Sequence, residues 1–196
     1  MTTGLIQIAV LVAILTAGVV LYNRLVALRN RHVNAFSQID VQLQRRHELI
    51  PNLVETARVY LEHERETLVA VTEARDTAEA CRRKAAAVPE DGARIGALAS
   101  ADGALGAAMG RLNVVMEAYP ELKADARLSE LHAELASTEN RVGYARQAYA
   151  DAVMRYNTAR EQFPAVLVAS ACRFREATPF ELSDERRREA VAVSFA

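Results

Sequence analysis

Apolar residues are arranged along this chain in three different ways. The first is a continuous run over residues 5–22, LIQIAVLVAILTAGVVLY, which contains no charged residue. A helix of this length measures about 27 Å, close to the thickness of the hydrocarbon layer of a bilayer. No basic residue precedes the run, and LTAGVV is a poor cleavage site. The pattern therefore favours an uncleaved transmembrane helix within an N-terminal segment, residues 1–23, over a signal peptide.

The second arrangement is an apolar residue at every third or fourth position, which places these side chains on one face of a helix. The resulting stripe continues to about residue 87 and predicts one long helix over residues 24–87. Arg46 takes one position in the stripe, where we expect it to pair with a carboxylate or to extend its charged end to water. The apolar positions are Phe36, Ile39, Leu43, Ile50, Leu53, Ala57 and Tyr60.

Pro51 interrupts this predicted helix in the stretch RRHELIPNL, residues 45–53. Proline removes one backbone hydrogen bond and clashes with the preceding turn, which costs roughly 3 kcal/mol unless the helix bends or restarts. We therefore predict a kink or hinge at Pro51.

Two more helices are predicted after a loop at residues 88–93, VPEDGA. The first carries a heptad seam that Pro120 ends, and the second starts near Asp125. The seam positions are Leu98, Ala101, Leu105, Ala108, Leu112, Val115 and Tyr119, then Leu128, Leu131, Leu135, Thr138, Val142, Ala145, Tyr149, Ala152 and Tyr156. Such seams pack helices at shallow angles. The predicted fold is all-α, with the transmembrane helix continuing into an elongated antiparallel bundle of three to four long helices over residues 24–182.

The third arrangement is a short apolar patch, FPAVLVASACRF, at residues 163–174. It is too short to span a membrane. It could cap the bundle or contact lipid or a partner, and we favour the cap. The charged residues 183–196 are predicted to form a flexible tail.

Charge sets the expected partners and location. The chain carries 24 Lys and Arg residues against 25 Asp and Glu residues, which does not favour nucleic acid as a partner. Locally, five arginines between residues 24 and 47 are opposed by Asp40 alone. Such an excess tends to stay on the cytoplasmic side of a membrane. We expect a single-pass protein with its N-terminus outside and its main domain in the cytoplasm.

Candidate chemistry is sparse. His47 and Glu48 resemble the opening of a zinc-protease motif, but the second histidine would fall at position 51, which is Pro51. The four histidines are scattered, and Cys81 and Cys172 form no CxxC motif. We therefore predict no catalytic residue, no metal site, no cofactor and no small-molecule substrate.

Several stretches of the chain resemble the LemA family. They are YNRLVALRNRHVNAFSQIDVQLQRRHELIPNLVETARVYLEHE (residues 22–64), AYPELKAD (118–125), TENRVGYARQAYADAVMRYN (138–157) and FPA (163–165). The resemblance implies a single-pass protein of the bacterial inner membrane with a cytoplasmic helical bundle, and it implies that Pro51 is part of the fold. Phe36 stands where the family usually has Trp, and the C-terminal run follows the family only loosely. The polar residues within these motifs are Asp40, Gln42, Arg45, Arg46, Asn52, Glu139, Asn140 and Arg141.

The lengths of the predicted helices suggest a surface for self-association. A helix over residues 24–87 would extend about 95 Å, whereas the next helix returns only about 25 residues. Nothing within the chain would then cover the membrane-proximal stripe of Phe36, Ile39, Leu43, Ile50 and Leu53. A hairpin at Pro51 is disfavoured, because the turn would be very short and the returning segment would reach the bilayer. We therefore predict that neighbouring copies, or else a partner helix, cover the stripe.

These features favour a membrane-anchored, non-enzymatic scaffold or adaptor that self-associates and presents helical surfaces to protein partners. The alternative is a regulatory or accessory subunit of a membrane enzyme, such as an envelope quality-control protease. Both hypotheses need the same fold, and only the identity of the partner separates them.

Overall fold

The computed structural model describes residues 2–119, 121–122 and 125–180. Helices and connecting loops make up these residues, and no strand occurs among them, which confirms the all-α prediction. The elements in chain order are α1 (Thr2–Arg58), the 3-10 helix η1 (Glu62–Glu64), α2 (Arg65–Ala87), α3 (Gly92–Glu117), α5 (Ala126–Glu161) and α6 (Ala165–Ala171). The predicted flexible tail at residues 183–196 lies outside the described residues.

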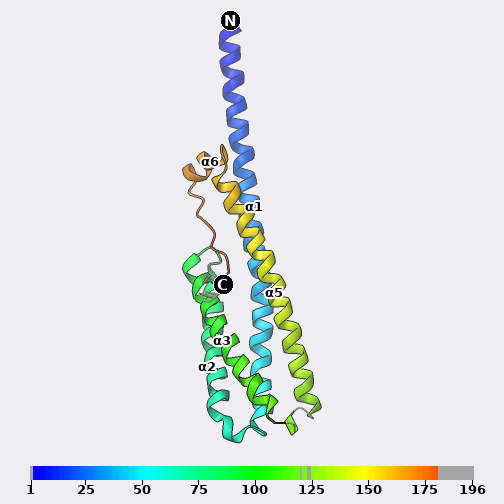
Figure 1. Cartoon of the computed structure of the whole chain (residues 1–196). Coiled ribbons are helices and arrows are strands. Elements are labelled where there is room, and N and C mark those ends of the chain that lie inside the picture. Colours follow the sequence, from blue (N-terminus) through cyan, green and yellow to red (C-terminus); the bar gives the residue numbers. More distant parts are fainter. Residues whose placement is uncertain (1, 120, 123–124, 181–196) are drawn as a thin grey trace, which may run out of the picture.

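Four helices form an elongated antiparallel bundle (Figure 1). The second half of α1 packs against α5 and α2, and α2 packs against α3. From the far end of α1 the chain returns along α2, reverses along α3, and returns once more along α5 toward the N-terminal end. The predicted bundle of three to four long antiparallel helices is confirmed.

α1 ends much earlier than the sequence pattern suggested. It continues through Pro51 and stops at Arg58, where residues 59–64 reverse the chain into α2. The prediction of one helix over residues 24–87 is therefore wrong. The amides of Tyr60 and Leu61 both donate to the carbonyl of Ala57 at 3.0 Å, which closes the last turn of α1. The helix neither ends nor restarts at Pro51, so a bend at that residue stays a prediction.

Aspartates start the two helices that follow the predicted loops. Asp91 accepts hydrogen bonds from the amides of Ala93 and Arg94, at 3.0 and 3.3 Å, and so caps the N-terminus of α3. Asp125 accepts from the amide of Leu128 at 3.0 Å and caps α5. The second oxygen of Asp125 accepts from the Tyr60 hydroxyl at 2.8 Å, which ties the start of α5 to the end of α1.

The stripe that we predicted to be an oligomer surface lies inside this bundle. Phe36, Ile39, Leu43, Ile50 and Leu53 are each exposed by 1% or less within the single chain. Because α1 ends at Arg58, the 23 residues of α2 run back for about 35 Å and reach the level of Phe36. The prediction that neighbouring copies cover this stripe is therefore wrong.

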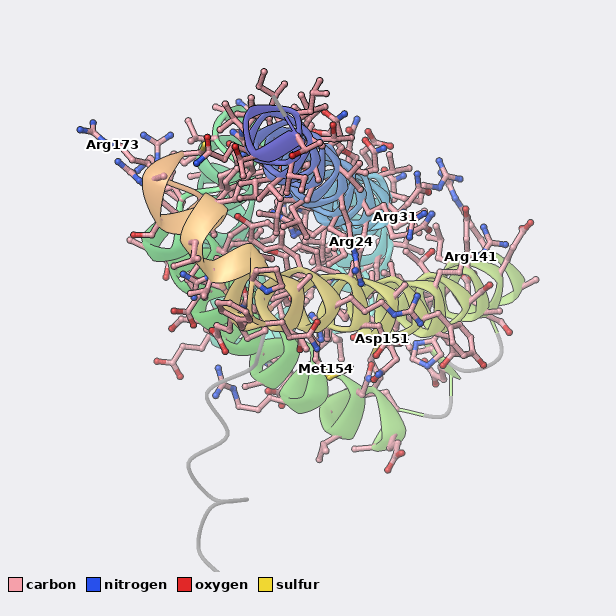
Figure 2. All side chains as sticks on the ribbon, turned by 90° about the horizontal axis from the view of Figure 1, so that it is seen from above. Arg24, Arg31, Arg141, Asp151, Met154 and Arg173 are labelled. Atoms are coloured by element: carbon pink, nitrogen blue, oxygen red, sulfur yellow. The ribbon has the colours of Figure 1, made fainter. Side chains whose placement is uncertain are left out.

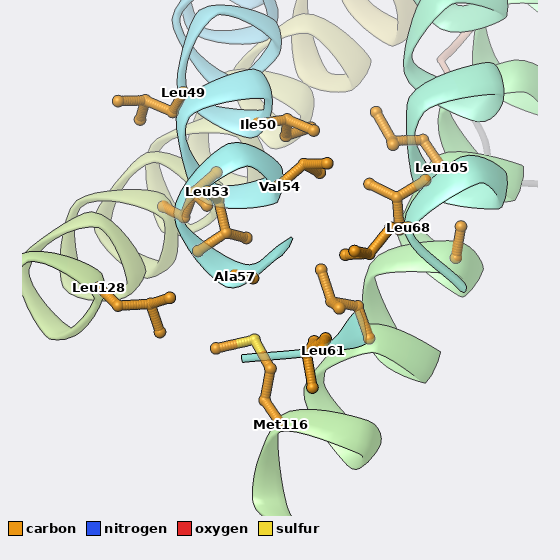
Figure 3. Packing of buried hydrophobic residues seen from close by; sticks show 14 of the residues in the cluster. Leu49, Ile50, Leu53, Val54, Ala57, Leu61, Leu68, Leu105, Met116 and Leu128 are labelled. Carbon is orange, nitrogen blue, oxygen red and sulfur yellow. The ribbon is translucent and has the colours of Figure 1, made fainter. Parts of the chain in front are cut away.

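Two apolar clusters fill the bundle. The cluster near the reversal of the chain brings together residues from α1, α2, α3 and α5 (Figure 3). It includes Leu49, Ile50, Leu53, Val54, Ala57, Leu61, Leu68, Leu105, Met116 and Leu128. The second cluster, closer to the N-terminal end, contains Phe36, Ile39, Leu43, Ile95, Leu98, Val142, Tyr149 and Tyr156. The predicted seams of the two later helices thus face the interior of the bundle.

The first third of α1 extends beyond the bundle (Figure 1). Its apolar side chains from Leu5 to Val20 are exposed, and the first buried side chain of α1 is Leu25. α1 is long and apolar enough there to cross a membrane by length and composition, and a signal sequence would pass the same test. The chain therefore has an apolar helix that no other described part of it covers.

α6 lies against the end of the bundle nearest to this free helix. Its residues Ala165 and Ala169 are buried, and Ala169 packs with Leu25 of α1 and Ala159 of α5. The 163–174 patch therefore covers this end of the bundle, as the favoured interpretation expects. Phe163 and Leu167 remain exposed, however.

Candidate functional site

Arg46 is the centre of a buried group of charges. It extends from α1 between the two apolar clusters, and its side chain is only 5% exposed. It forms an ion pair with Asp102 of α3 and donates a hydrogen bond to Glu139 of α5 at 2.7 Å. Arg146 of α5 pairs with the other carboxylate oxygen of Asp102. Of the two arrangements expected for Arg46, the structure shows the pairing with carboxylates.

A second group of charges joins α1 to α2. The Nδ1 atom of His47 lies 2.9 Å from the Glu79 carboxylate, and Arg82 and Arg83 each donate to that carboxylate at 2.7 Å. Arg82 also donates to Asp40 of α1 at 2.6 Å. Charge neutralisation therefore occurs within the bundle, both within α2 and between α2 and α1.

The surroundings decide the charge states of this second group. The Arg82 guanidinium donates hydrogen bonds to the Glu79 carboxylate and holds its pKa well below the usual range. Hydrogen bonds from His47 and Arg83 to the same carboxylate lower this pKa further. Burial lowers the pKa of His47, against the opposing effect of Glu79. Because arginines already neutralise the Glu79 carboxylate, His47 acts as a neutral hydrogen-bond donor near pH 7.

Pro51 explains a further contact of this region. A proline at position 51 has no amide hydrogen, so the carbonyl of His47 loses its usual helical donor four residues later. The Nε atom of Arg75 on α2 donates to this carbonyl at 3.0 Å. A side chain of the neighbouring helix therefore replaces the backbone hydrogen bond, and α1 can continue through Pro51.

The structure sorts the motif residues into two sets. Those in ion pairs are Asp40, Arg45, Arg46 and Glu139, with Arg45 paired to Glu134 on α5. The other four are Gln42, which is half-buried, and Asn52, Asn140 and Arg141, which are exposed. No hydrogen bond or ion pair joins these four side chains to another residue in the described part of the chain.

Sequence reasoning missed the partners of these charges. Asp102, Glu79 and Arg82 lie on the later helices and are all buried. Asp102 directly follows Ala101, a predicted seam position, and a charged residue next to a seam is typical of a solvated helix face. The signal that could have found it is Arg46 itself, which requires a carboxylate from another helix.

A segment after α6 is held along the bundle by side chains of α5. Asn157 donates to the carbonyl of Ala177 at 2.8 Å and accepts from its amide at 3.0 Å. The hydroxyls of Tyr149 and Tyr156 donate to the carbonyls of Thr178 and Arg175, at 2.9 and 2.8 Å. We call residues 173–180 the strap. All three α5 side chains belong to the AYADAVMRYN stretch of the quoted motifs, which the structure thus explains.

Aromatic contacts complete the docking of the strap. Phe174 packs edge-on against Tyr22 of α1, with ring centroids 5.6 Å apart, and the Arg146 guanidinium lies 5.0 Å from the centroid of the Phe180 ring. Burial raises the pKa of Tyr149 to about 12, so its hydroxyl remains a donor at neutral pH. The strap therefore fixes the C-terminal side of the bundle to α1 and α5.

A cavity of about 730 Å³ lies between the strap, α1 and the loop before α3. Arg29 and Glu90 form an ion pair at its wall, and His32 lines it while being almost fully buried. Burial lowers the pKa of His32, which is therefore neutral near pH 7. Among the described residues no group of three or more His, Cys, Asp and Glu side chains is placed to hold a metal ion.

The geometry defines a class of all-helical protein in which an exposed apolar N-terminal helix continues into a four-helix bundle with ion pairs in its core. Four of the eight polar motif residues form ion pairs that hold the helices of this bundle together. The model of the LemA family matches residues 35–195, and the chain belongs to the LemA family. The comparison with curated proteins gave no match.

Proposed function

We propose that this protein is a membrane-anchored, non-enzymatic scaffold or adaptor whose bundle presents a helical surface to protein partners. The observation that carries the proposal is the continuity of α1. Its large apolar side chains from Leu5 to Val20 are exposed, and from Leu25 onward the same helix contributes residues to the core of the bundle. A bilayer is the surrounding that would cover this apolar length, because its thickness matches that of the uncharged run.

The outer face of α5 is the surface that we assign to partners. Asn140 and Arg141 lie four and three positions before Tyr144, so each shares a helix face with it. All three are exposed, and Tyr144 is exposed by 79%. Tyrosine and arginine are enriched at the energetically important positions of protein interfaces. Because other polar residues of the same motifs are used in internal ion pairs, these exposed ones support an external role.

Site-specific photo-crosslinking tests this assignment in the full chain within native membranes. A photo-reactive phenylalanine analogue at position 144 is expected to give a discrete adduct. The matched control is position 114, because Val114 on α3 is similarly exposed, at 70%, and lies outside the quoted motifs. Equal adducts at both positions, or none at position 144, would refute the assignment.

The mass of the adduct also separates the forms of the proposal. An adduct of twice the chain mass identifies self-association through α5, now that the stripe on α1 is known to be internal. An adduct that contains a membrane protease favours the regulatory alternative. Any other single protein favours the adaptor.

The proposed location has its own test. The excess of arginine after Tyr22 supports a cytoplasmic bundle in a bacterial inner membrane. A Val88→Cys variant, with the exposed Cys172 changed to Ser, is expected to resist a membrane-impermeant maleimide on intact cells and to react after lysis. Labelling of intact cells would reverse the proposed orientation.

A further inference from the structure

The turn between α5 and α6 carries an apolar patch that the bundle leaves exposed. Phe163 is exposed by 80%, Leu167 by 63% and Val166 by 38%. The opposite side of the same helix is buried, because Ala165 and Ala169 face the bundle. The segment is therefore amphipathic, with large apolar side chains on its outer side. A segment that only capped the bundle would turn its large apolar side chains toward the bundle and its small residues outward.

Contacts fix the height of this turn along α1. Ala169 packs with Leu25, and Phe174 packs edge-on against Tyr22, which is the last residue of the uncharged run. Leu25 lies three residues beyond Tyr22, a distance of about 4.5 Å along the helix. α5 runs toward the free length of α1, so the α5–α6 turn forms the end of the bundle nearest to it (Figure 1).

This height matches the interfacial layer of a bilayer. The headgroup region adds roughly 5–7 Å to each side of the hydrocarbon layer, and amphipathic segments bury their apolar faces about 5–10 Å into that boundary. If the uncharged run ends where the hydrocarbon ends, the turn beside Leu25 is already within the headgroups. Its exposed phenyl and leucyl side chains are then within reach of the acyl chains.

Exposed arginines lie on α1 beyond the uncharged run and at the end of α6. In the view along α1 from the N-terminal end, Arg24 and Arg31 lie beside α1 and Arg173 extends from the end of α6 (Figure 2). These three arginines form no ion pair with other residues in the described ranges. Arg160, by contrast, is paired with Glu161 and Glu176. Arg24, two residues beyond Tyr22, and Arg173, next to Phe174, lie at the level of the turn and suit the phosphates of an anionic leaflet.

We propose that Phe163, Val166 and Leu167 form a second membrane contact, which enters the interfacial layer of the leaflet from which α1 emerges. The occupant of this face is lipid, because the turn lies at the level where the apolar part of α1 ends, and Arg173, unpaired among the described residues, follows α6. The bundle is then held to the bilayer at two points, α1 and the α5–α6 turn. The inference rests on the proposed function, in that α1 must be a membrane anchor.

The absence of tryptophan from the chain permits a direct test. Three full-length variants each carry a single fluorophore: Phe163→Trp in the turn, Leu11→Trp in the apolar part of α1, and Tyr144→Trp on the outer face of α5. Each is reconstituted into nanodiscs that contain anionic lipid, with either ordinary or brominated acyl chains. Bromine quenches tryptophan only on contact, so the loss of emission reports lipid at that residue.

The proposal expects bromolipid to quench the fluorophores at positions 11 and 163 and to leave the one at position 144 unchanged. Bromine near the headgroup end of the chain should quench position 163 best, and deep bromine should quench position 11 best. Leu167→Trp provides a second probe of the same patch, should the variant at position 163 fold poorly. Quenching at position 167 alone would then still support the contact.

The remaining outcomes separate the two proposals. Quenching at position 11 but at neither 163 nor 167 overturns the second contact and leaves the anchor intact. Blue-shifted but unquenched emission at position 163 also overturns it, because protein and not lipid would then cover the patch. No quenching at position 11 overturns the anchor itself, and with it the proposed function.

Discussion

Replacement of Asp102 by alanine is expected to lower the free energy of unfolding by about 3 kcal/mol. Asp102 is 1% exposed and neutralises both Arg46, which is 5% exposed, and Arg146, which is 17% exposed. Removal of one partner from a buried ion pair costs roughly 3–5 kcal/mol, because the other charge stays buried. Arg46 keeps Glu139 as a partner, and Arg146 keeps some contact with water. The lower end of that range therefore applies.

Thermal unfolding in detergent, followed by far-UV circular dichroism, measures this effect. For a chain of this length, about 3 kcal/mol corresponds to a fall in Tm of roughly 6–12 °C. Asp151→Ala is the matched control, because this half-buried aspartate accepts a hydrogen bond from Gln147 within its own helix. We expect the control to change stability by less than about 0.5 kcal/mol.

A paired variant shows whether the buried charge is the cause. Arg46→Met with Asp102→Leu removes both charges and fills the space with apolar atoms, a change that is often neutral or stabilising by about 1–4 kcal/mol. This double variant should melt above Asp102→Ala. A double variant that melts below it, or an Asp102→Ala protein with an unchanged Tm, would refute the reasoning.

Three further predictions follow from the contacts of α1 and of the strap. Acidification from pH 8 to pH 5.5 should lower the Tm. Folding depresses the pKa of His47, so the unfolded chain binds a proton at this histidine first, below about pH 6.5. His47→Asn should make the dependence of Tm on pH shallower. Arg75→Met should lower the free energy of unfolding by about 1.5–3 kcal/mol in denaturant titrations, because the carbonyl of His47 loses its donor. The loss should be smaller in a Pro51→Ala background, where the new amide of residue 51 can donate to this carbonyl. Asn157→Ala should release the strap and hasten tryptic cleavage within it.

Each of these predictions has a control and a contradicting result. His63→Asn changes an exposed histidine and should leave the pH dependence as it is; equal effects of both histidine variants would show that burial of His47 is not responsible. Equal costs of Arg75→Met with and without Pro51 would mean that the missing amide is irrelevant. Asn140→Ala, on the exposed face of α5, should not alter the rate of tryptic cleavage. An unchanged cleavage rate in Asn157→Ala would show that the Asn157 side chain does not hold the strap.

The apolar periodicity predicted the helices well and their reversals poorly. Seam residues such as Leu105 and Val142 are buried as expected, since periodicity reports which face of a helix meets others. The end of α1 at Arg58 was missed because the reversal at residues 59–64 contains neither Pro nor Gly. Pro51, a strong helix-breaking signal, lies instead within a continuous helix that Arg75 supports from α2. Local signals therefore favoured the wrong position for the break.

The same error explains the misplaced oligomer surface and the missing ion partners. A helix that continues to residue 87 leaves no other helix of the chain to cover Leu43, and so requires a second copy. Pairing between Asp40 and Arg82, which are 42 residues apart, depends on the reversal as well. The need of Arg46 for a carboxylate could be predicted from its position in the stripe, but Asp102 could be chosen only after the register between α1 and α3 was known.

Because α1 is continuous, a change in its tilt would move the bundle together with it. Residues 25–58 extend about 50 Å beyond the end of the uncharged run. In the proposed membrane anchor, the spanning part of α1 would change its tilt when the thickness of the hydrocarbon layer changes, and no loop separates this part from the bundle. A change in tilt of 10° would displace the far tip, near Arg58, by about 9 Å. Local bilayer thickness would thereby be converted into the lateral position of a distant protein surface.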